Sequence, residues 1–120
     1  MTGPDAVTAW IDNYRAAWAS NDPAQIGALF TEDAEYFPEP YAPPWRGREQ
    51  IVERWLDRKD DPGSWTFEWH PLIVTADLAI IEGETVYPKI RYSNLWVLRL
   101  DRSGRARHFT EWWMDQSKPS

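Results

Sequence analysis

The stretch YSNLWVLRLDRSGRARHFTEWWMD, residues 92–115, decides the fold. Its two ends are rich in aromatic and aliphatic residues, and side chains of alternate positions fall on opposite faces of a strand. Between them, Asp101-Arg102-Ser103-Gly104 has the composition of a tight turn. The segment therefore predicts a β-hairpin whose strands are Tyr92–Leu100 and Ala106–Asp115.

The residues before this hairpin predict two further strands. In one, Trp65, Phe67 and Trp69 alternate with polar residues, which indicates a half-buried strand. The other covers Leu78–Tyr87, and the Pro88-Lys89 pair makes a looser connection to the hairpin.

The first half of the chain predicts three helices. A spacing of three and four residues defines one buried helix face, formed by Val7, Trp10, Ile11, Tyr14, Ala17 and Trp18. A short second helix begins at Asp22-Pro23, where the aspartate caps and the proline takes the first helical position. A short strand at 34–37 and a proline-rich loop at 38–45 precede a third helix, Arg48–Lys59.

Helices followed by consecutive strands, without β-α-β alternation, indicate an α+β fold with an antiparallel sheet. A chain of 120 residues has the size of one domain, and we expect residues 1–120 to form a single one.

Composition excludes several classes of protein. A net charge of -6 argues against binding of a nucleic-acid backbone, and the absence of cysteine excludes disulfides and thiolate-ligated metals. The sequence has no stretch of apolar residues long enough to cross a membrane and no leader pattern, so we expect a cytoplasmic protein. The 9 Trp, 5 Tyr and 4 Phe residues must be packed, stacked on a ligand or buried in an interface.

Several short motifs, in this order and spacing, resemble the nuclear-transport-factor-2-like superfamily and its SnoaL-like members. They are NDP (21–23), ALFTEDA (28–34), WRGREQI (45–51), NLW (94–96) and EWW (111–113). The resemblance covers nearly the whole chain and implies a cystatin-like α+β roll. In such a roll, a cone-shaped antiparallel sheet wraps around three N-terminal helices and leaves an apolar pocket at its open end. Polyketide cyclases, ketosteroid isomerase and scytalone dehydratase share the fold, which therefore implies no single reaction.

Comparison with ketosteroid isomerase places Tyr14 at the helix-borne phenol that donates a hydrogen bond to the substrate. The aspartate base of that enzyme corresponds to Pro38, and its second aspartate falls near Trp96. The resemblance therefore does not imply ketosteroid isomerisation by the same groups.

The same comparison implies that three glutamates converge in the pocket and act with Tyr14. They are Glu82, Glu84 and Glu111. Carboxyl groups that share an apolar site can differ in protonation, which supplies an acid and a base for isomerisation, cyclisation or dehydration without a cofactor. The expected substrate-binding residues are Trp18, Phe30, Tyr36, Trp55, Trp69, Asn94, Trp96 and Trp113.

Structural roles remain open for all of these residues. Each glutamate could instead be solvated or paired with an arginine, Tyr14 could be a core residue, and Asn94 could bind backbone. Tyr41 and Trp45 on the proline-rich loop could form a lid. We predict no metal site, because His70 and His108 lie on the strand faces opposite the expected cavity.

The opposite sheet face is apolar for a surface bathed in water, and we expect a second copy to cover it as a homodimer. Its predicted members are Ile81, Thr85, Tyr87, Leu95, Val97, Thr110, Trp112 and Met114. Three functions remain: an enzyme acting on a small apolar organic compound, a non-catalytic binder or carrier of such a ligand, and an interaction module with a vestigial cavity.

Overall fold

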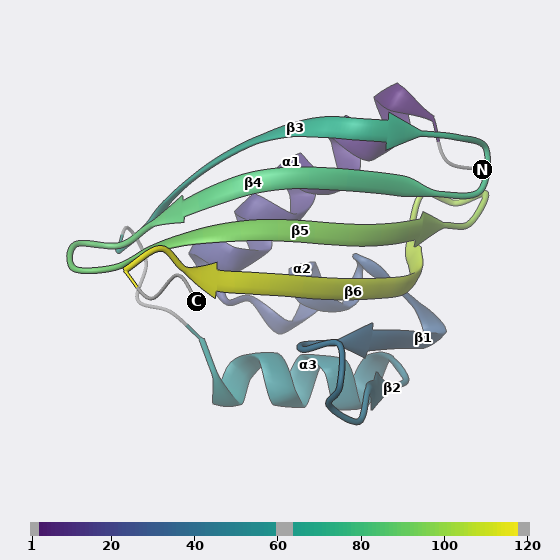
Figure 1. The fold of residues 1–120 in the computed structure, drawn as a ribbon. Coiled ribbons are helices and arrows are strands. Elements are labelled where there is room, and N and C mark those ends of the chain that lie inside the picture. The colour runs from purple at the N-terminus through teal and green to yellow at the C-terminus, as the bar shows by residue number, and fades with distance from the viewer. Residues whose placement is uncertain (1–2, 60–63, 118–120) are drawn as a thin grey trace.

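The computed structural model describes residues 3–59 and 64–117, in which three helices pack against one face of a six-stranded sheet (Figure 1). The helices are α1 (Pro4–Ser20), α2 (Pro23–Gly27) and α3 (Arg48–Asp57). The strands are β1 (Phe30–Phe37), β2 (Trp45–Arg46), β3 (Thr66–Val74), β4 (Ala79–Val86), β5 (Arg91–Leu100) and β6 (Ala106–Asp115). This arrangement confirms the predicted α+β fold. None of the described helices is long and apolar enough to cross a membrane.

Helix α1 carries the predicted buried face. Trp10 is 2 % exposed, and its indole N–H donates to the carbonyl oxygen of Leu29 at 2.9 Å, which ties the helix to the residue before β1. The helix ends where Asn21 adopts a left-handed conformation, with φ of 53°. Helix α2 then begins at the predicted cap, because the Asp22 carboxylate accepts from the Ala24 amide at 2.9 Å.

The sheet has the strand order β2-β1-β6-β5-β4-β3. The four long strands β3 to β6 pair antiparallel, as predicted. Strand β1 joins this antiparallel sheet by pairing parallel with β6, and it begins at Phe30 rather than at the predicted Ala34. A parallel pair needs a long connection, and here most of the chain lies between the two strands.

Strand β4 faces the opposite way from the prediction. Ile81 and Thr85 are 1 % and 3 % exposed and lie on the inner face, whereas Glu82 and Glu84 lie on the outer face. The physical reason lies in Gly83, which has no side chain beyond a hydrogen atom and so leaves room for the Phe67 ring of the neighbouring strand β3. A glutamate side chain at this inner position would fill that room. The inner face is thus packed without desolvating two carboxylates.

The two outer glutamates have partners of their own. Glu82 is 3.0 Å from the His70 imidazole, and Glu84 is 3.9 Å from Arg91 and accepts from the Gln116 amide at 2.9 Å. The predicted convergence of Glu82 and Glu84 in the cavity is therefore wrong. Ile81, Thr85 and Tyr87, which we expected outside, belong to the inner side with Gly83.

Strands β5 and β6 follow the predicted alternation. Asn94 and Trp96 on β5 share the inner face with Phe109, Glu111 and Trp113 on β6. On the outer face, Trp112 and Met114 are 41 % and 58 % exposed beside the half-buried Leu95 and Val97. The homodimer through this face stays a prediction.

Candidate functional site

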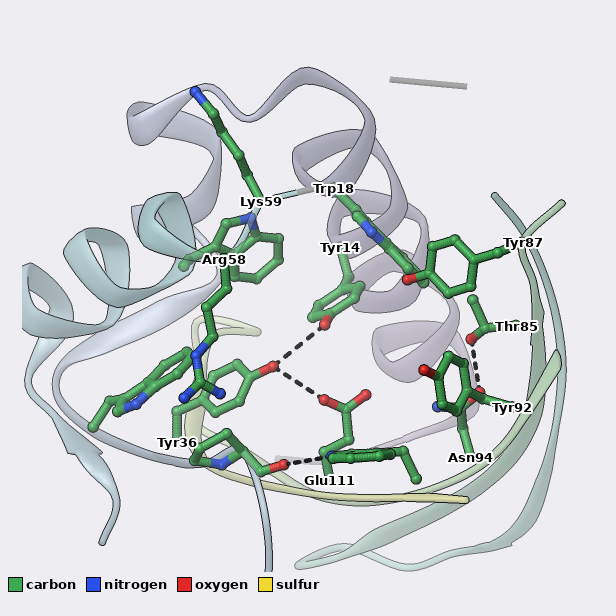
Figure 2. A pocket seen from close by; sticks show the side chains of 14 residues that line it. Tyr14, Trp18, Tyr36, Arg58, Lys59, Thr85, Tyr87, Tyr92, Asn94 and Glu111 are labelled. Carbon is green, nitrogen blue, oxygen red and sulfur yellow. Dashed lines mark hydrogen bonds between the residues drawn. The ribbon is translucent and has the colours of Figure 1, made fainter. Parts of the chain in front are cut away.

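A cavity of about 420 Å³ opens between α1, the end of α3, the proline-rich loop and the inner face of the long strands (Figure 2). This volume falls in the range of sites that bind small molecules. Its lining is mainly aromatic, with hydroxyl, amide and charged groups between the rings. The lining residues are Tyr14, Trp18, Tyr36, Pro38, Trp45, Trp55, Arg58, Lys59, Thr85, Tyr87, Tyr92, Asn94, Glu111 and Trp113.

Glu111 is the carboxylate of this lining, and two buried groups hold it. Trp96 lies opposite Glu111 on the adjacent strand β5, and its indole N–H donates to Oε2 at 3.1 Å. The Tyr36 hydroxyl donates to Oε1 at 3.4 Å. Because an indole nitrogen can only donate, Oε2 is fixed as an acceptor and the carboxyl plane is oriented.

The hydrogen-bond chain extends to the helix. The Tyr14 hydroxyl lies 3.5 Å from that of Tyr36, and since Tyr36 donates to Glu111, Tyr14 is the donor of this contact. Figure 2 shows both phenols and the carboxyl group directed toward one another inside the cavity. Tyr14 therefore lines the cavity with its hydroxyl group, and its donation to a ligand stays a prediction.

The burial of the two tyrosines determines the protonation state of Tyr36 in this hydrogen-bonded series. Tyr14 and Tyr36 are 6 % and 5 % exposed, and the Tyr36 ring packs edge-on against Phe109 at 4.8 Å. Burial raises the pKa of Tyr36 well above 10.0, and the neighbouring Tyr14 and Glu111 raise it further. Tyr36 therefore stays protonated at neutral pH and remains a donor to the carboxylate.

A second polar pair lies on the same inner sheet face as Glu111, on the neighbouring strands β4 and β5. The Thr85 hydroxyl donates to the Asn94 side-chain oxygen at 2.7 Å (Figure 2). The sequence predicts that Asn94 contacts the ligand or binds backbone, and its observed side-chain partner is a threonine on the neighbouring strand. This pair offers a ligand a further polar contact on the sheet side of the cavity.

The proline-rich loop contributes one of its two rings. Trp45 stacks on Tyr36 with ring centroids 4.7 Å apart and forms part of the cavity wall. Tyr41 is fully exposed, at 100 %, and does not line the cavity, so the lid formed by the two rings stays a prediction. Trp113 joins the loop to β6, because its indole N–H donates to the Pro38 carbonyl at 3.3 Å.

The other expected site residues divide into two groups. Trp18 and Trp55 line the cavity as predicted. Phe30 is fully buried in the core, and Trp69 packs against the core without lining the cavity. Trp96 is also buried and does not line the cavity, but it donates a hydrogen bond to Glu111, which does.

Sequence reasoning missed six lining residues. They are Pro38, Arg58, Lys59, Thr85, Tyr87 and Tyr92. Tyr92 shares the face of Asn94, so the strand alternation pointed to it, and a correct orientation of β4 would have added Thr85 and Tyr87. No sequence signal places the end of α3 beside the cavity. No group of three metal-ligating side chains occurs within residues 3–59 and 64–117.

Comparison with known proteins places the chain in a family. The sequence model of the SnoaL-like domain matches residues 7–115. A search of curated protein sequences finds no match.

Solved structures share the fold at low sequence identity. An NTF-2 like protein of unknown function from Burkholderia xenovorans is 14 % identical, with a TM-score of 0.75 over 97 % of this chain and 88 % of that one. A ketosteroid isomerase-like protein from Erwinia carotovora atroseptica is 19 % identical, with a TM-score of 0.68 over 96 % of each chain. A steroid delta-isomerase from Pseudomonas aeruginosa is 17 % identical, with a TM-score of 0.65 over 96 % of this chain and 83 % of that one. With the match over residues 7–115, the chain belongs to the SnoaL-like family of the nuclear-transport-factor-2-like superfamily.

Proposed function

We propose that the cavity binds a small, mainly apolar, oxygenated compound and that Glu111 transfers a proton to and from it without a cofactor. The observation that carries this proposal is the Glu111 carboxyl group, held in an aromatic cavity by Trp96 and Tyr36. A base that is fixed and half-buried among aromatic rings is well suited to removing a proton from a bound compound.

One carboxylate changes the expected chemistry. Since Glu82 and Glu84 lie outside, no second carboxyl group among the described lining residues can serve as a separate acid. A single carboxylate can take a proton from one atom of a ligand and return it to another, which is an isomerisation, or return it to a leaving oxygen, which is a dehydration. A ligand oxygen that gains negative charge would accept the single proton of the Tyr14 phenol in place of the Tyr36 oxygen.

The names of two structural neighbours support this class of reaction, since one is called a steroid delta-isomerase and one ketosteroid isomerase-like. Their TM-scores support a shared fold, and their low sequence identity to this chain leaves the substrate open. Pro38, in the loop after β1, stands where the resemblance puts the aspartate base, so the proposed base is a different residue, on β6.

A general probe of such a base is 5-nitrobenzisoxazole. Removal of its C3 proton forms a nitrile, breaks the N–O bond and releases a coloured phenolate, so no further reactant is needed. We expect the protein to accelerate this reaction and Glu111→Gln to lower kcat/KM by about a hundredfold or more. Glu82→Gln is the matched control, because it makes the same change on the outer face.

Binding is measured separately with 2-naphthol, whose fluorescence reports transfer into an apolar site. If Glu111→Gln retains naphthol binding and loses the elimination, the proposal holds. If the wild-type protein binds naphthol but gives no acceleration over buffer, Glu111 is not a competent base and the protein is a non-catalytic binder. If Glu111→Gln and Glu82→Gln lower the rate equally, the proposed role of Glu111 is wrong.

A further inference from the structure

Arg58 is a charged residue of the cavity that the proposed reaction does not use. It follows the last residue of α3, where its amide donates to the Trp55 carbonyl at 3.0 Å and closes the helix. Its guanidinium carbon lies 5.6 Å from the centroid of the Trp45 ring. Figure 2 shows the guanidinium group turned down toward Tyr36, whereas the ammonium group of Lys59 points away from the other lining side chains.

This guanidinium has an aromatic neighbour but no anionic one in the part of the chain that the structure describes. The ion pairs found there use Arg46, His70 and Arg91. Packing on a ring fixes the plane of a guanidinium group and leaves its N–H donors free to form two parallel bonds to a carboxylate.

The charge of the cavity differs from that of the chain. The whole protein has 19 acidic and 13 basic residues, yet the described lining holds two cations, Arg58 and Lys59, against the single carboxylate of Glu111. A ligand with an anionic group would therefore be attracted to the α3 side, while its opposite end would lie nearer Glu111.

We propose that the natural ligand is a carboxylic acid with an aromatic or alicyclic body, and that Arg58 binds its carboxylate. The body packs between Trp55 and Trp113, and the end remote from the carboxylate presents its reacting atoms to Glu111. Arg58 is then the residue that selects acids over neutral compounds of the same shape. This inference rests on the proposed function, because it names the substrate class of the same cavity.

The test compares 2-naphthoate with 2-naphthol, two compounds with one ring system that differ in the charged group. We expect the wild-type protein to bind naphthoate more tightly at neutral pH. Arg58→Gln should weaken naphthoate binding about tenfold or more and leave naphthol binding unchanged, because a bond to a charged group is lost. Arg58→Lys should retain part of the affinity, since it keeps the charge without the planar fork.

Arg54→Gln is the matched control, because Arg54 lies on the same helix and does not line the cavity. Equal binding of the two compounds by the wild-type protein would overturn the inference, as would equal losses in the Arg54 and Arg58 variants. The outcome is distinguishable from that of the elimination assay. If naphthoate binding depends on Arg58 but the elimination is absent, the protein binds carboxylic acids and the proposed reaction is wrong. If the elimination occurs without any preference for naphthoate, the proposed reaction holds and the proposed substrate class is wrong.

Discussion

Replacing Gly83 with alanine should destabilise the protein and disturb the site together. A Cβ atom at this position would lie 2.7 Å and 2.8 Å from Cε1 and Cζ of Phe67, and 3.0 Å from the Glu68 carbonyl oxygen. Ordinary contacts between carbon atoms are about 3.5–4.0 Å, so the ring must move by roughly 0.8 Å. The Phe67 ring is 2 % exposed and stacks on Trp96 at 4.9 Å, which leaves it little room to move.

The net effect follows from two opposing contributions. Overpacking in a core costs about 1–3 kcal/mol, and alanine recovers about 0.4–1 kcal/mol through the lower entropy of the unfolded chain. We therefore expect Gly83→Ala to lower the free energy of unfolding by about 1–2 kcal/mol. Since Trp96 is the donor to Glu111, the variant should also lose rate in the elimination assay.

Urea unfolding followed by far-ultraviolet circular dichroism measures the stability. The matched control is Gly27→Ala in α2, where the nearest atom to a new Cβ is Arg48 Cδ at 3.4 Å, an ordinary contact, and where alanine favours the helix. Gly27→Ala should be neutral or stabilising. If Gly83→Ala were as stable as the wild type, the close packing of Phe67 against β4 would not be what orients this strand.

Two further predictions follow from the same structure. Because burial raises the pKa of Tyr36, the folded state keeps this proton where the unfolded state loses it, so stability should fall as the pH rises above about 10. Tyr36→Phe should reduce that loss in urea titrations across the alkaline range, and an identical slope would contradict it. The exposed Trp112 and Met114 predict a homodimer that sediments at twice the mass of the chain. Trp112→Glu should give the single-chain mass, and a wild-type protein that sediments as a single chain would refute the dimer.

The sequence was sufficient to predict the helices, the hairpin and the α+β class, because each rests on local signals. The helix face of Trp10 and Tyr14 has an unambiguous period, and the cap at Asp22 is a short-range interaction. Alternation grouped Asn94 with Trp96 and Glu111 with Trp113, and the resemblance to ketosteroid isomerase identified these faces as the inner ones.

The orientation of β4 could not be predicted in the same way. Its two faces carry similar amounts of apolar surface, so alternation alone does not choose between Ile80 and Ile81. The orientation depends on how the Phe67 ring of the neighbouring strand β3 packs against Gly83, which is a tertiary contact. The placement of Arg58 beside the cavity depends likewise on where the end of α3 packs, for which the sequence holds no local signal.

The parallel pairing of β1 with β6, a seam between the two ends of the polypeptide, has a consequence for how the binding site forms during folding. The Tyr36–Glu111 and Trp113–Pro38 hydrogen bonds each join residues 75 positions apart, one from either side of this seam. Such contacts close a large loop and are acquired late when a chain collapses from local structure outward. The cavity is thus completed only after the final strand has been added, and any compound that fills it stabilises the joint between the beginning and the end of the polypeptide.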